Sequence, residues 1–170
     1  VRVDSGVGNT PSLIVLNMSR FVNLQELSIG NGCFENVKEL KLIGMNMLER
    51  VMIGRLAFEN CERAVFENLP RLSSILLGWS VLTFKDISNS TLIMKNLVKL
   101  TSFLADGESG SDSTTFAYPR YVTFENMPLL TEVRLHYAFQ RVIQFSVQNA
   151  GEMTNRAKKM MIVKSTDEWN

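Results

Sequence analysis

Five leucines recur along this chain at nearly constant intervals, and this spacing constrains the fold more than any other feature of the sequence. They are Leu24, Leu48, Leu72, Leu100 and Leu130. The first two intervals are 24 residues each, and the next two are 28 and 30 residues. Self-similarity at such a period is typical of a solenoid, in which each repeat packs against its neighbours. We therefore expect a repeat domain that displays a surface and does not enclose a reactive pocket.

Apolar residues fill the same five positions around each leucine: three, six and eight residues before it, and three and five residues after it. In the unit of Leu48 they are Met45, Leu42, Leu40, Val51 and Ile53. Together with the leucine itself, these positions form six columns across the five units. Hydrophobic residues make up 45% of the chain, so chance does not fill all six columns in all five units. In the first unit Phe21 stands three residues before the leucine. We expect it to turn inward at the bend, like its equivalents.

The spacing within each unit has a period of two, which is typical of strands rather than helices. In one unit the two predicted strands cover 39–42 and 50–53. We predict a mainly β solenoid of about five turns, with two short parallel strands per turn and little or no long helix. The solenoid should span 13–145, with an incomplete turn or cap at 1–12 and another at 146–170. Within the latter, 156–161 fits a short basic helix or an incomplete strand. The simplest interpretation of these ends is a fragment of a longer array.

Two segments carry a resemblance to a known family. The stretch 53–61, with the sequence IGRLAFENC, resembles the IGxxAFxxC core of BspA-like leucine-rich repeats, and 29–36 is a looser copy. The stretch 24–29 fits the LxxLxL strand of leucine-rich repeats. The resemblance covers about 13–145 and is closest to the long arrays of some intestinal protists. It implies surface display, adhesion or protein binding. The usual repeat asparagine is replaced by Gly32, Leu56 and Ser80, so we do not expect the usual asparagine ladder after this strand.

Two columns of turn residues flank the predicted strands. They consist of Asn68, Asn96 and Asn126, and of Gly30, Gly54 and Gly78. Asparagine tolerates a left-handed backbone and bonds nearby backbone groups, so we favour a structural role at the corners over ligand binding. For the three glycines we expect a bend with positive φ after the strand.

Composition and single residues argue against several functions. Lys and Arg number 18 against 17 Asp and Glu, which gives no sign of nucleic-acid binding. No apolar run is long enough for membrane insertion by this segment.

Cys33 and Cys61 fall in different columns, so we expect free buried thiols. His136 is the only histidine, so we expect no metal site, no cofactor and no enzyme activity. Sequons at 17–19 and 89–91 weakly favour a cell-surface or secreted location, which stays open.

The side chains that alternate with the inward columns give the candidate binding surface. An apolar strip of Met52, Leu76, Leu104 and Trp79 is flanked by Arg50, Arg55 and Arg134. Protein interfaces favour Met, aromatic residues and Arg. The alternatives are that neighbouring loops of a longer parent chain account for the strip, or that surfaces simply tolerate scattered hydrophobic residues. The predicted function is a non-catalytic protein-binding or adhesion module for an unknown protein ligand. The alternative is an architectural spacer within a larger receptor or enzyme whose activity lies outside this segment.

Overall fold

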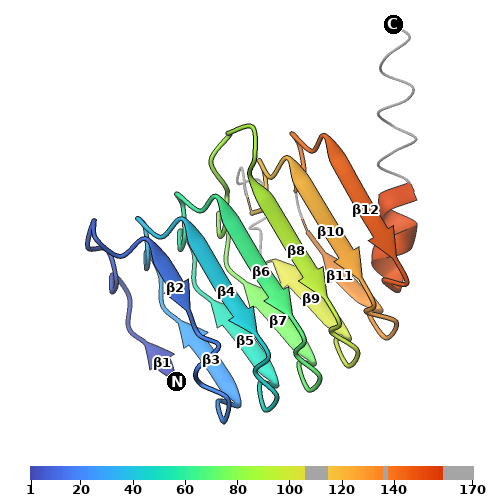
Figure 1. The fold of residues 1–170 in the computed structure, drawn as a ribbon, viewed down its shortest axis with the longest axis horizontal. Helices are drawn as coiled ribbons and strands as arrows, with labels where there is room; N and C mark the ends of the chain where they lie inside the picture. The colour runs from blue at the N-terminus through green and yellow to red at the C-terminus, as the bar shows by residue number, and fades with distance from the viewer. Residues whose placement is uncertain (106–114, 136–137, 159–170) are drawn as a thin grey trace, which may run out of the picture.

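The structure is a computed structural model of the 170-residue chain and describes residues 1–105, 115–135 and 138–158. Its strands form two six-stranded parallel sheets, and successive strands alternate between them (Figure 1). The first sheet contains β1 (Arg2–Val3), β3 (Glu26–Ile29), β5 (Arg50–Ile53), β7 (Ser74–Leu77), β9 (Ser102–Ala105) and β11 (Glu132–Arg134). The second sheet contains β2 (Val15–Asn17), β4 (Glu39–Ile43), β6 (Arg63–Glu67), β8 (Thr91–Lys95), β10 (Tyr121–Glu125) and β12 (Gln144–Gln148).

This arrangement confirms a mainly β solenoid with two strands per turn. It has about six turns, because β1 and β12 add one strand at either end of the five leucine units. Strand β1 lies within 1–12 and pairs with β3, whereas β12 runs from residue 144 into 146–170. A short helical segment follows at 152–158 (Figure 1). Of the two forms considered for 156–161, a helix and an incomplete strand, the helix is found at 156–158, and 159–161 lie outside the described residues.

The hydrophobic columns stack into a continuous core between the two sheets. Residues three positions after the leucines pair from coil to coil, in the order Leu27, Val51, Ile75, Phe103 and Val133. All five are buried, as are four of the five anchor leucines. Leu24 is only partly buried, in the first of the five units. The column three residues before the leucines is also buried in the later units, at Met45, Leu69, Leu97 and Met127.

Phe21 corrects the prediction for that column, because half of its surface is exposed. It follows β2, the edge strand of the second sheet, which has a neighbouring strand on one side only. A side chain in this column is covered only when coils lie on both of its sides. The sequence pattern therefore identifies the column correctly but not the burial at its end.

The asparagine column confirms the predicted corner role. Asn68, Asn96 and Asn126 have φ values of 55°, 55° and 56°, and Asn149 continues the column with a φ of 48°. Each side-chain amide donates to the preceding asparagine Oδ1, over 2.8 Å from Asn96, 3.0 Å from Asn126 and 3.3 Å from Asn149. This ladder follows the strands of the second sheet. The ladder is therefore not at the position of the usual leucine-rich-repeat asparagine, which Gly32, Leu56 and Ser80 occupy and where we expected no ladder.

The glycine column corrects another prediction. Gly30, Gly54 and Gly78 do not have positive φ. They are required because the preceding coil lies where a β-carbon would be. A β-carbon on Gly54 would lie 2.5 Å from Asn31 Oδ1, and one on Gly78 would lie 2.5 Å from Arg55 N. The left-handed residues come two positions later, at Gly32, Leu56 and Ser80.

Both cysteines are free and buried, as predicted. Cys61 Sγ lies 3.2 Å from the carbonyl oxygen of Arg63. Loss of water on burial raises the pKa of the Cys61 thiol to about 12. The thiol therefore stays protonated near neutral pH and acts as a small hydrophobic group.

Candidate functional site

The predicted apolar strip lies on the outer face of the first sheet. Strand alternation turns Val51 and Ile53 into the core and leaves Met52 outside. The strands pair in register, so Met52 lies beside Leu76, and Leu76 lies beside Leu104. Exposed fractions of 37% for Met52 and 38% for Leu76 show that both side chains are accessible, whereas Leu104 is half-buried. Three successive coils therefore contribute one apolar side chain each, about 4.8 Å apart.

Arginines border this strip in different ways. Arg50 pairs with Glu26 on the neighbouring strand, directly opposite in the register, so its charge is already balanced. Arg134 on β11 pairs with Leu104 on β9, and its side chain is exposed. Arg55 lies beyond the end of β5, with its guanidinium carbon 5.8 Å from the centre of the Trp79 ring. This distance fits a cation–π contact, which holds both side chains in place.

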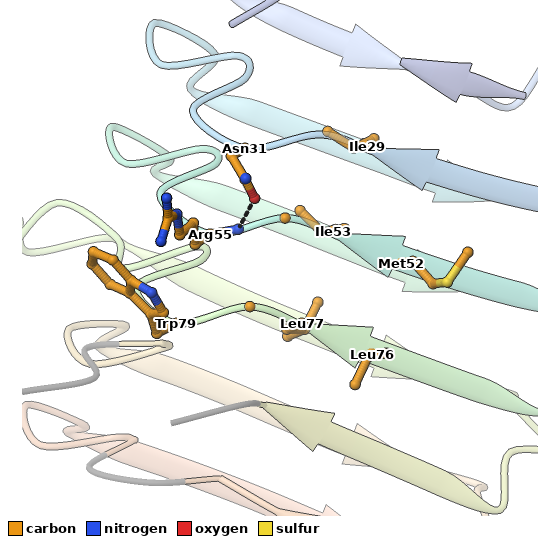
Figure 2. Close-up of a pocket in the computed structure, with 10 residues that line it drawn as sticks. Ile29, Asn31, Met52, Ile53, Arg55, Leu76, Leu77 and Trp79 are labelled. Atoms are coloured by element: carbon orange, nitrogen blue, oxygen red, sulfur yellow. Dashed lines mark hydrogen bonds between the residues drawn. The ribbon is translucent and has the colours of Figure 1, made fainter. Parts of the chain in front are cut away.

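An open hollow of about 560 Å³ lies where β3, β5 and β7 end. Figure 2 shows that Asn31, Arg55 and Trp79 stand at the strand ends, with Met52 and Leu76 further along β5 and β7. Gly54 and Gly78 also line it and contribute no side chain. This volume is within the range of small-ligand and side-chain pockets.

A second hollow, of about 460 Å³, adjoins the first. It is lined by residues of β1 and β3, including Val3 and Ser28. Met52 lines both hollows. The two hollows lie next to each other along β1, β3, β5 and β7 with Met52 between them, and together they are called the groove.

The structure brings four of the seven predicted site residues to one place. Met52, Arg55, Leu76 and Trp79 line the first hollow. Leu104 and Arg134 extend the surface along the same face, and Arg50 is held by Glu26. Whether these residues bind a partner stays a prediction.

Asn31, one residue after Gly30, lines the first hollow but is not among the predicted site residues. Its Oδ1 accepts a hydrogen bond from Arg55 N over 3.0 Å (Figure 2). A polar residue one position after a glycine of the column was the signal available in the sequence. His136, the sole histidine, lies outside the described residues.

The described ranges contain no group of three or more His, Cys, Asp or Glu side chains arranged to hold a metal ion. Within the same ranges no helix is both long and apolar enough to cross a bilayer. No protein-family model, curated protein or solved structure matches this chain. The geometry of the groove and the strip is therefore the basis for inferring a function.

Proposed function

We propose that this chain is a non-catalytic binding module whose protein partner docks on the outer face of the first sheet. The observation that carries the proposal is the alignment of Met52, Leu76 and Leu104 on adjacent strands beside the groove. Apolar side chains on rigid strands bury surface on binding at little entropic cost. Trp79 and Arg55 add the residue types that most often dominate binding energies.

We also propose that the chain is a BspA-like leucine-rich repeat protein that acts in surface display or adhesion. The packing of 53–61 supports this, because the fixed positions of the resembling motif each have a structural role. Ala57, Phe58 and Cys61 are fully buried, Ile53 is in the core, and Gly54 has no room for a β-carbon. A motif with such roles is expected to recur wherever this coil recurs.

The binding role is tested by selecting a displayed peptide library against the purified chain. Leu76→Arg is the informative variant, because it places a charge in the centre of the strip. Ile93→Arg is the matched control, since Ile93 is half-buried on β8, in the second sheet. Circular dichroism checks that both variants keep the β-rich spectrum. We expect selected peptides to lose at least about tenfold in affinity for Leu76→Arg and to bind Ile93→Arg as they bind the parent chain.

Peptides that bind the parent chain and Leu76→Arg equally would contradict the proposal. So would a selection that enriches no peptide at all. Either result would favour the alternative, in which the solenoid is a spacer whose outer face contacts nothing specific.

A further inference from the structure

A row of side-chain oxygens links successive coils at the position after each glycine of the column. Asn31 N donates to Ser5 Oγ over 3.0 Å, and Arg55 N donates to Asn31 Oδ1 over 3.0 Å. Each coil thus supplies the acceptor for the backbone N–H of the next coil. The row continues with Trp79, which follows Gly78 as Arg55 follows Gly54.

The row is broken at Trp79. The residue that would supply the acceptor for its N–H is Arg55, and an arginine side chain has only donors. Backbone bonds beside the row continue unchanged, since Gly54 N donates to Ile29 O over 2.7 Å and Gly78 N donates to Ile53 O over 2.8 Å. The Trp79 N–H therefore repeats the placement of the Arg55 N–H one coil later. Among residues 1–105, 115–135 and 138–158, none provides an acceptor for it.

Arg55, which stacks on the Trp79 ring, places a positive charge near this N–H. Arg55 forms no ion pair with any residue in the described ranges, in contrast to Arg50 with Glu26. Stacking on Trp79 holds the guanidinium beside the hollow and leaves its edge free to donate. A carboxylate accepts hydrogen bonds from a guanidinium and a backbone N–H at once, and such charge-assisted bonds are the stronger kind.

We propose that the Arg55 guanidinium and the Trp79 N–H together recognise the carboxylate of an acidic side chain within an extended protein segment. This inference rests on the proposed function, and it names the chemistry of the partner. Apolar residues two positions from the acidic residue point to the same side of an extended segment and would lie on Met52 and Leu76. Because the second hollow lies beyond Met52, a segment in the first hollow has room to continue along the sheet and need not end there. An internal acidic side chain therefore fits better than a terminal carboxylate.

The test is a titration of the ¹⁵N-labelled chain, followed by ¹H–¹⁵N spectra, with the capped peptide acetyl-Leu-Ala-Asp-Ala-Leu-amide, whose leucines share the face of the Asp. Two matched peptides accompany it: acetyl-Leu-Ala-Asn-Ala-Leu-amide, which lacks the carboxylate, and acetyl-Leu-Ala-Asn-Ala-Leu with a free C-terminus. We expect a downfield shift of the Trp79 amide that saturates with the Asp peptide. The Asn amide should bind roughly tenfold more weakly, as the loss of charge-assisted bonds predicts.

Two substitutions of Arg55 separate this site from a nonspecific charge effect. In Arg55→Asn the new side-chain oxygen should accept a hydrogen bond from the Trp79 N–H, as Asn31 Oδ1 accepts one from the Arg55 N–H. This variant should melt at a higher temperature than the parent and should lose the response to the Asp peptide. Arg55→Lys keeps the charge and adds no acceptor, so it should melt like the parent and retain a weaker, charge-dependent response.

Equal shifts with the Asp and Asn amides would overturn the proposal, as would stronger binding of the free C-terminus. An undiminished response in Arg55→Asn would also overturn it. Failure here is distinguishable from failure of the proposed function. If library-selected peptides lose affinity for Leu76→Arg but bind Arg55→Asn unchanged, the face binds partners and only the carboxylate recognition is wrong.

Discussion

At the scale of single residues, a missing methyl group determines how closely two coils approach at Gly54. Its β-carbon would lie 2.5 Å from Asn31 Oδ1, 2.6 Å from Gly30 C and 2.7 Å from Asn31 N. Two of these three atoms belong to the backbone and cannot turn away. The same contact brings Asn31 Oδ1 to the N–H of Arg55, so the close approach also shapes the hollow.

Gly54→Ala should therefore lower the free energy of unfolding by about 1–3 kcal/mol, the usual cost of overpacking. Urea denaturation measures it. The added removal of the Asn31 side chain, in Asn31→Ala with Gly54→Ala, should not restore stability, because the backbone contacts remain. A neutral single variant, or recovery in the double variant, would contradict this explanation of the glycine.

Cys61 should make stability fall at alkaline pH. Burial raises the pKa of its thiol from 9.0 to about 12, so only the unfolded chain releases this proton between those values. The free energy of unfolding should then decrease with rising pH in this window, at up to about 1.4 kcal/mol per pH unit. Urea denaturation from about pH 8 to about pH 10.5 measures it. Cys61→Ala is the control, since it keeps the other titrating groups. Parallel curves for the two chains would refute the assignment.

Residue-scale details were the least predictable part of the structure. The glycine column was visible in the sequence, but not whether it serves positive φ or close approach. Phe34 and Phe58 have φ of 58° and 59°, which no local rule predicts for aromatic residues. Their rings stack 5.2 Å apart, so packing between coils determines these conformations. Whether the Trp79 N–H has an acceptor also depends on which side chain the neighbouring coil supplies.

At the scale of structural elements, the asparagine ladder fixes the corner after the strands of the second sheet. Asn96 occupies its middle, accepting from Asn126 and donating to Asn68. Its backbone is left-handed, a conformation that costs most residues roughly 1–2 kcal/mol. Gly44, in the same column, has a φ of 67° and shows that glycine meets the same backbone requirement.

Asn96→Ala should lose both the side-chain bonds and the tolerance for positive φ, at a cost of about 2–4 kcal/mol in unfolding free energy. Asn96→Gly keeps the backbone conformation and should cost about 1–2 kcal/mol less than the alanine variant. Thermal and urea denaturation of both variants give the comparison. Equal losses would mean that the backbone conformation contributes nothing at this corner.

Elements were well predicted, because period-two alternation over five units specifies strand faces directly. The outer strip of Met52, Leu76 and Leu104 followed from the same alternation. The hollow beside it did not, since it depends on how the turns after the strands fold. Arg55 and Trp79 could be placed in one column from the sequence, but their stacking could not.

At the scale of the whole molecule, each coil is completed only by its neighbours. The core is a stack of side chains from different coils, and the outer strip and groove are equally composite. End effects follow from the same property: Phe21 and Leu24 lose burial in the first of the leucine units. Any binding surface on this fold therefore depends on the register between coils more than on a single turn.

The register itself can be measured by methyl–methyl nuclear Overhauser effects in a chain labelled at Leu, Ile and Val methyl groups. We expect contacts between Leu27 and Val51 and between Val51 and Ile75, because these residues pair on adjacent strands. We expect none between Leu27 and Ile75, which are two strands and about 9.6 Å apart. A direct Leu27–Ile75 contact, or no contact between Val51 and Ile75, would contradict the stacked-coil structure and the surface built on it.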